Sequence, residues 1–330
     1  MSTQRMTFAK AINTGLRAAL ERDPKVLLMG EDIGALGGVF RVTDGLAKDF
    51  GTDRVVDTPL AESGIVGTAI GLALRGYRPV CEIQFDGFIF PAFDQITTQL
   101  SKMHYRSRGR LNLPVVIRVP FGGGIGAVEH HSESPEVLFA HTAGLRVVSP
   151  SDPQDAYTMI QQAVASPDPV MFFEPKGRYW EKGDVDTGAD PLAADSVLDG
   201  ARVLRPGTDV TLVAHGPTVA TALRVADAAA AEGRSVEVVD LRSISPLDIT
   251  TVAASVRRTG RCVVVHEAPV LYGTGAEVAA RVTEECFYHL EAPVLRVGGF
   301  HTPYPVAKLE HEYLPGLDRV LDAVDRVLAS

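Results

Sequence analysis

The chain has 330 residues, of which 45% are hydrophobic and 22% are charged, and its formal net charge is −9. This composition is typical of a soluble globular protein with room for two domains. The negative charge, with no basic stripe to offset it, argues against a nucleic-acid partner. The apolar run between Glu62 and Arg75 is about a dozen residues, too short to span a bilayer. The three widely spaced cysteines give no disulfide framework. We therefore expect a cytoplasmic protein without a membrane role.

Strand and helix patterns alternate along the first half of the chain. Apolar residues at helical spacing predict a helix from Phe8 to Leu20, with Thr7 as its N-cap. A buried-type strand at Val26–Met29 runs into a glycine-rich loop that does not match Gly-x-Gly-x-x-Gly, so the dinucleotide fingerprint fails. Further strands are predicted at 55–56, 79–85, 114–119, 145–148 and 169–174, and helices near 63–75, at 91–108 and after 135. This alternation predicts an α/β fold with largely parallel sheets.

The pattern lapses between residues 184 and 207, where Asp, Gly, Ala and Pro predominate. We interpret this range as a linker between a first domain (1–183) and a smaller second domain (208–330). In the second domain strands are predicted at 210–214, 236–239, 262–265 and 294–297. Helices are predicted at 218–231 and 276–289, with a last helix that ends near 328. The sequence thus predicts two open parallel-sheet domains.

Glu62 is the only acid in a stretch of small and apolar residues where a strand turns into a helix. Gly64, Gly67 and Gly71 then share one helix face, at a cost of about 1 kcal/mol each relative to alanine. One interpretation is a carboxylate on a tightly packed inter-subunit seam, aimed at a ligand. The other is a glycine-tolerant core helix whose N-terminal acid is favoured by the helix dipole.

A second candidate region is the loop 120–135, which is rich in glycine and contains His130 and His131. The spacing of its histidines and acids matches no zinc motif. A loop histidine suits proton transfer or charge stabilisation, and equally a hydrogen bond within its own loop. Ser63 and Ser132 lack the Gly-x-Ser-x-Gly elbow of serine hydrolases. The lone His215 and His266 are predicted to be packing residues.

Phenylalanines 85, 88, 90 and 93 follow directly after a predicted strand end. Ligands of open α/β sheets bind at the carboxyl ends of strands, where a planar heterocycle could stack on these rings. Ordinary core packing is the alternative explanation.

With these motifs in this order, the sequence resembles the β subunits of the thiamine-diphosphate-dependent 2-oxo acid dehydrogenases over nearly its whole length. Five stretches carry the resemblance: Thr-Pro-Leu-x-Glu at 58–62, Glu-Ile-Gln-Phe at 82–85, Phe-Pro-Ala-Phe-Asp-Gln at 90–95, His-Ser-x-Ser-Pro-Glu at 131–136 and Val-Asp-Leu-Arg at 239–242. The resemblance implies a pyrimidine-binding domain like that of transketolase, followed by a transketolase C-terminal-like domain.

The resemblance also implies roles for individual residues. Glu62 would hydrogen-bond N1′ of the aminopyrimidine and so favour the imino tautomer that activates the thiazolium carbon. Leu60 and Phe88 would line or stack on the pyrimidine, and His131 would assist acyl transfer to lipoamide. Glu31 would lie on the path between two cofactor sites, although Pro91 stands where some pyruvate enzymes carry a further acid on that path.

The resemblance also implies partner subunits and bound ions, some from a family motif that this sequence lacks. The family's diphosphate and Mg²⁺ motif, Gly-Asp-Gly followed by Asn-Asn, does not occur here. The resemblance therefore implies an α subunit that holds the diphosphate and Mg²⁺ in an α2β2 heterotetramer, together with a lipoyl-bearing acyltransferase core. Relatives also hold K⁺ through backbone oxygens, here near Leu113, Val115, Val116, Ala163, Ser166 and Asp168.

The stretches at 90–95 and 130–136 look more like branched-chain than pyruvate members, so a branched-chain 2-oxo acid is the favoured substrate. A pyruvate or acetoin enzyme is the alternative. A nucleotide-binding electron-transfer protein, or a non-catalytic assembly subunit with a merely structural Glu62, are the two further hypotheses.

Overall fold

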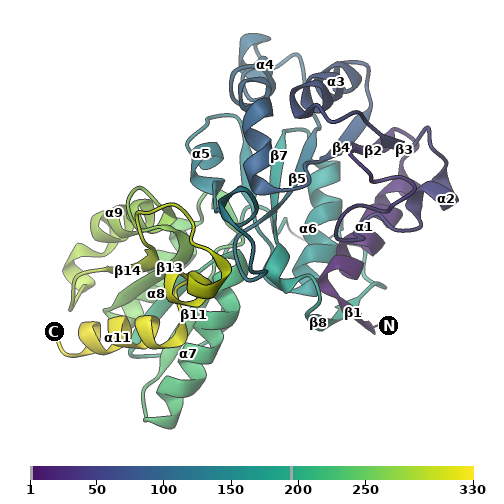
Figure 1. Ribbon diagram of the computed structural model, residues 1–330. Coiled ribbons are helices and arrows are strands. Elements are labelled where there is room, and N and C mark those ends of the chain that lie inside the picture. Colours follow the sequence, from purple (N-terminus) through teal and green to yellow (C-terminus); the bar gives the residue numbers. More distant parts are fainter. Residues whose placement is uncertain (1–2, 194–195) are drawn as a thin grey trace.

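The computed structural model describes residues 3–193 and 196–330, and it consists of two α/β units that lie side by side (Figure 1). Residues 1–2 and residues 194–195, which fall inside the expected linker, lie outside the described residues. No helix of the described ranges is both long and apolar enough to cross a bilayer.

The first unit is built on a seven-stranded sheet in the order β12-β6-β7-β5-β4-β2-β3. All neighbouring strands are parallel except β12, which runs antiparallel to β6. The strands are nearly continuous runs of buried apolar residues, as expected when helices cover both faces. Their bounds are β2 (Val26–Gly30), β3 (Val55–Asp57), β4 (Arg78–Glu82), β5 (Val116–Phe121), β6 (Arg146–Val148), β7 (Val170–Pro175) and β12 (Ser243–Ser245).

Helices cover this sheet on two sides, and each side forms its own apolar core. Helices α1 (Phe8–Arg22) and α6 (Pro153–Ala165) pack against each other over one core, while α3 (Glu62–Leu74) and α5 (Glu136–Ala140) belong to the other. The predicted N-cap of α1 is confirmed, because the Thr7 hydroxyl accepts a hydrogen bond from the Lys10 N–H at 3.2 Å.

The helical segment predicted at 91–108 begins at Asp86 and is not a regular α-helix. It consists of a 3₁₀ segment η1 (Asp86–Ala92), a π segment η2 (Gln95–Leu100) and the short α4 (Met103–Arg106). The hydroxyls of Thr97, Thr98 and Ser101 each donate to the carbonyl four residues earlier, at 2.7–2.8 Å. Such side-chain bonds compete with the helical N–H groups and loosen the winding.

The second unit has a five-stranded sheet in the order β14-β13-β10-β11-β9, parallel except for β9. Helices α7 (Val219–Ala231) and α11 (Leu317–Leu328) cover one face, and α8 (Ile249–Thr259) and α9 (Thr274–Cys286) the other. The strands are β9 (Arg202–Arg205), β10 (Val210–Ala214), β11 (Val236–Asp240), β13 (Cys262–Pro269) and β14 (Leu295–Gly299). The two predicted parallel-sheet α/β units are therefore confirmed.

Two strands lie inside or across the range 184–207. Strand β8 (Lys182–Asp186) pairs antiparallel with β1 (Thr3–Thr7), and β9 joins the second sheet. Their pairing is not evident from the composition of this range, which is dominated by loop-forming residues.

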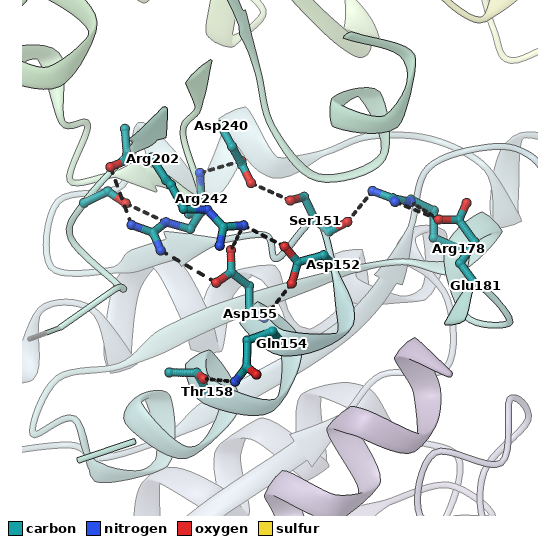
Figure 2. Close-up of polar contacts among 12 residues, drawn as sticks. Ser151, Asp152, Gln154, Asp155, Thr158, Arg178, Glu181, Arg202, Asp240 and Arg242 are labelled. Atoms are coloured by element: carbon teal, nitrogen blue, oxygen red, sulfur yellow. Dashed lines mark hydrogen bonds and ion pairs between the residues drawn. The ribbon is translucent and has the colours of Figure 1, made fainter. Parts of the chain in front are cut away.

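Charged side chains hold the two units together (Figure 2). Arg202 of β9 binds Asp152 at 2.6 Å and Asp155 of α6 at 3.0 Å, and Arg242 approaches Asp155 to 3.6 Å from the second unit. Burial raises the pKa of Asp155 to about 7 and that of Asp240, the last residue of β11, to about 6. The Val-Asp-Leu-Arg stretch thus belongs to the junction between the units.

Candidate active site

Strands β2, β4 and β5 are consecutive neighbours in the first sheet, so their carboxyl ends meet at one edge. The register places Gly30 beside Glu82, and Glu82 beside Arg118. The loops that leave β2, β4 and β5 carry Glu31, Phe88 and His131, respectively. Leu60 and Glu62 lie at the start of α3, and the expected K⁺ ligands lie elsewhere, around the start of β5 and the end of α6. That edge is where open α/β sheets bind ligands.

Glu31 and Glu62 come together at this edge. Both are buried, with 7% and 8% of their surface exposed, and one follows β2 while the other begins α3. Burial raises the pKa of Glu31, the nearby Glu62 charge raises it further, and the Ala61 N–H opposes the shift. One carboxyl oxygen of Glu31, Oε1, has no hydrogen-bond partner among the described residues. This acid pair fits a ligand that brings hydrogen-bond donors.

The segment before α3 exposes Leu60 and leaves one helix face bare. The Thr58 N–H donates to the Gly30 carbonyl at 2.9 Å, which fixes the turn, while Leu60 remains 80% exposed. A Cβ atom built on Gly67 or Gly71 would meet no heavy atom within 4 Å. The described part of the chain therefore offers no backbone that packs closely on this glycine face.

His131 lies in an aromatic setting formed by the residues after β4. Its ring stacks on Phe85 with centroids 4.0 Å apart and 17° between planes, and meets Phe88 edge-on at 5.2 Å. Its Nδ1 atom is buried without a hydrogen-bond partner among the described residues. Two of the four phenylalanines that follow the predicted strand thus contact His131. The other two, Phe90 and Phe93, pair with each other, with ring centroids 6.5 Å apart.

A buried charge cluster lies beneath these loops. The Arg118 guanidinium binds Glu82 at 2.6 Å and both oxygens of Glu174 at 2.6 and 2.9 Å, and Tyr179 donates to Glu174 at 2.5 Å. Burial raises the pKa of Glu82, with Arg118 opposing the shift. Above the cluster Phe40 packs on Tyr179 and on Phe85, at 4.9 and 5.5 Å. The cluster therefore supports the aromatic group that holds His131.

Several buried groups near the site did not stand out in the sequence. Asp86 and Lys176 form an ion pair at 2.7 Å with both side chains fully buried. Glu136 is fully buried with neither oxygen partnered in the described ranges, and His215 Nε2 lies 3.7 Å from its Oε1. The available signal was a charged residue at or shortly after the end of a buried strand: Lys176 directly follows β7, and Asp86 begins the segment η1 that comes after β4. The predicted burial of His215 is confirmed, and so is that of His266.

The described residues contain no group of three or more His, Cys, Asp or Glu side chains placed to hold a metal ion. They therefore do not fit Mg²⁺. Among the expected K⁺ ligands, the Ser166 carbonyl accepts from the Arg78 guanidinium at 3.3 Å, a fixed positive charge that opposes a cation there. The K⁺ site stays a prediction.

Two domain families match the chain. The family described as transketolase, pyrimidine binding domain, matches residues 4–181, and that described as transketolase, C-terminal domain, matches residues 199–320. A solved structure entitled "Split gene transketolase, inactive beta4 tetramer" superposes with a TM-score of 0.78 at 25% identity, covering 98% of both chains. The fold and the acid pair thus define a protein of the thiamine-diphosphate-dependent, transketolase-like class.

Relatives resolve the family further. The chain is 64% identical to the pyruvate dehydrogenase E1 component subunit beta of Leifsonia xyli subsp. xyli, over 99% of this chain and 96% of the relative. It is 57% identical to the 3-methyl-2-oxobutanoate dehydrogenase subunit beta of Mycobacterium tuberculosis, over 99% and 93%. It is 44% identical to the 2-oxoisovalerate dehydrogenase subunit beta of Pseudomonas aeruginosa, over 98% and 95%. The chain belongs to the E1 β-subunit family of the thiamine-diphosphate-dependent 2-oxo acid dehydrogenases.

Proposed function

We propose that this chain, together with an α subunit, forms the decarboxylating first component of a branched-chain 2-oxo acid dehydrogenase complex and passes the acyl group to lipoyl groups of an acyltransferase core. The observation that carries the proposal is the buried pair of Glu31 and Glu62 at the start of a helix with a bare glycine face. The pair fits an aminopyrimidine, whose ring nitrogen N1′ shares a proton with a carboxyl group and whose amino group donates a hydrogen bond. The bare face fits a close inter-subunit seam. The α subunit would hold the diphosphate and Mg²⁺ in an α2β2 assembly, which we expect in the cytoplasm.

Thiamine diphosphate, when bound, supplies the nucleophilic carbon that a 2-oxo acid needs to lose carbon dioxide. The chain's own residues bind and orient the pyrimidine and handle protons. Glu62 holds a proton at the ring nitrogen N1′, with Glu31 beside it as a second acid. Leu60 and Phe88 supply apolar surface for the ring. His131 moves a proton at a ring nitrogen during acyl transfer, and its stack on Phe85 fixes the plane of that ring.

The substrate class rests on the stretches at 90–95 and 130–136, and two relatives with branched-chain names support it. A pyruvate dehydrogenase is the second candidate, favoured by the 64% identity to a relative with that name. Reconstitution with the α subunit and assay of both 2-oxo acids decides between them. A larger kcat/KM for pyruvate than for 3-methyl-2-oxobutanoate contradicts the branched-chain assignment.

The roles of the two named side chains are tested in the same assembly. We expect Glu62→Gln to abolish measurable decarboxylation, with Glu21→Gln on the exposed side of α1 as the matched control. Normal turnover by the Glu62 variant would remove its role and leave the chain a structural subunit. For His131→Ala we expect lipoyl acylation to fall more than decarboxylation measured with an artificial electron acceptor. His130→Ala is its control, because the adjacent His130 side chain is 63% exposed.

A further inference from the structure

The loop that carries His131 is fixed by four consecutive residues, 85–88, at the start of the segment after β4. Phe85 and Phe88 contact the His131 ring, as described above, whereas the two residues between them contact the loop backbone. We propose that Asp86, paired with Lys176, and Gly87 are positioning residues for His131. The inference rests on the acyl-transfer role proposed for that histidine.

Asp86 ties the loop to the sheet through both of its carboxyl oxygens. Oδ1 accepts from the Lys176 ammonium at 2.7 Å, and Oδ2 accepts from the backbone N–H of Glu133 at 2.8 Å. The Glu133 carbonyl in turn accepts from the Gly122 N–H at 3.0 Å, at the far end of the same loop. The loop is thus closed on itself at Glu133 and anchored there by a buried charge, two residues beyond His131.

Fold stability alone is a weak reason for such a pair. Taking two charges out of water costs several kcal/mol per ion, and apolar replacements of buried ion pairs are often neutral or stabilising. What the pair provides here is a hydrogen bond of fixed direction to one backbone N–H of the loop. A carboxylate shared between an ammonium and an N–H group makes that bond short and directional.

Gly87 brings the loop backbone close to the sheet edge. A Cβ atom at this position would lie 2.5 Å from the His130 carbonyl oxygen and 2.9 Å from the His130 Cα. These are backbone atoms next to His131, so any side chain at position 87 must displace the segment that carries the histidine. The contact is steric and independent of the Asp86 charge, which makes it a second and separate test.

The charged residues around Asp86 and Lys176 show which of the two can be replaced with the smaller disturbance of the local electrostatics. Lys176 also lies in the field of Glu267 and Glu310, so that it keeps negative neighbours when Asp86 is neutralised. Replacing Lys176 instead would leave Asp86 beside Glu136 and Glu267 without a cation. Asp86→Asn and Asp86→Ala are therefore the variants of choice, the first keeping an acceptor oxygen and the second removing it.

The experiment compares two activities of the reconstituted α–β assembly: acylation of a lipoyl domain and decarboxylation with an artificial acceptor. A misplacement of about 1 Å costs up to about a hundredfold in rate, so we expect the acylation-to-decarboxylation ratio to fall about tenfold or more in Gly87→Ala and Asp86→Ala. Asp86→Asn should lie between these variants and the wild type. Asp155→Asn, another buried paired acid, and Gly316→Ala, whose added Cβ meets nothing within 4 Å, should keep the ratio.

The outcomes separate this inference from the proposed function. If His131→Ala lowers the ratio but Gly87→Ala and the Asp86 variants do not, the positioning role is refuted while the role of His131 stands. If acylation and decarboxylation fall equally in the Gly87 and Asp86 variants, these residues have only a structural role, and the positioning role is again refuted. An unchanged ratio in His131→Ala refutes the proposed role of His131, and the inference with it. If Asp86→Ala fails to fold, Gly87→Ala and Asp86→Asn carry the test.

Discussion

Glu136 provides a sharp test of the electrostatics between the two units, because it is a fully buried carboxyl without a cation beside it. Burial raises its pKa from 4.5 to about 8. The backbone N–H of Glu136 itself acts to lower the pKa, whereas the negative charges of Glu267 and Asp86 raise it further. The folded chain therefore keeps a proton on Glu136 in a range where the unfolded chain has lost it. The group's contribution to stability is present in full below pH 4.5 and is lost as the pH rises through about 8.

The size of this effect follows from linkage. Each pH unit between 4.5 and about 8 lowers the free energy of unfolding by about 1.4 kcal/mol, so the full cost at pH 9 is on the order of 5 kcal/mol. Glu136→Gln keeps the shape of the protonated acid and removes the titration. We expect the variant to match the wild type near pH 5 and to become more stable by a few kcal/mol at pH 9. His215 does not disturb this window, because burial lowers its pKa to about 3.

Denaturant unfolding from pH 5 to pH 9, at one protein concentration, measures the difference between variant and wild type. The other buried acids titrate equally in both proteins and cancel. Glu129→Gln, an exposed acid of the preceding loop, is the matched control and should show no pH-dependent gap. A gap between Glu136→Gln and wild type that stays constant across this range would refute the reasoning.

Three further predictions concern the buried charge cluster around Arg118, one crowded glycine and one uncrowded glycine. Arg118→Met leaves two buried carboxylates without their cation, so we expect a loss of about 3–5 kcal/mol in denaturant unfolding; a loss below about 1 kcal/mol contradicts the importance of the cluster. Gly144→Ala should destabilise by about 1–3 kcal/mol, because φ is +96° and the Cβ would overlap the Ser101 carbonyl oxygen; an unchanged melting temperature argues against this strain. Gly71→Ala should stabilise the isolated chain by up to about 1 kcal/mol yet weaken co-purification with the α subunit; undiminished association would remove the proposed seam.

The local sequence pattern was sufficient to predict an element where its apolar periodicity differs clearly from that of the flanking residues. The buried strands and the amphipathic α1 and α11 were predicted because apolar periodicity and caps are local properties of the chain. Helix α6 was missed because it is buried on several sides, with Gln161 and Gln162 inside it as well as apolar residues. Its Gln162 amide donates to the Pro191 carbonyl at 2.8 Å, a partner that no local pattern indicates.

The sequence by itself determined the two α/β units, the family and the identity of the candidate side chains, Glu31, Glu62 and His131 among them. Only the tertiary structure decided which of them meet: that Glu31 lies beside Glu62, that His131 stacks on Phe85, and that Asp86 finds Lys176 ninety residues away. The reason is that strand order in a parallel sheet is set by how helices and sheet pack as a whole. Neighbouring strands share an edge whatever their distance along the chain, and local periodicity carries no record of that order.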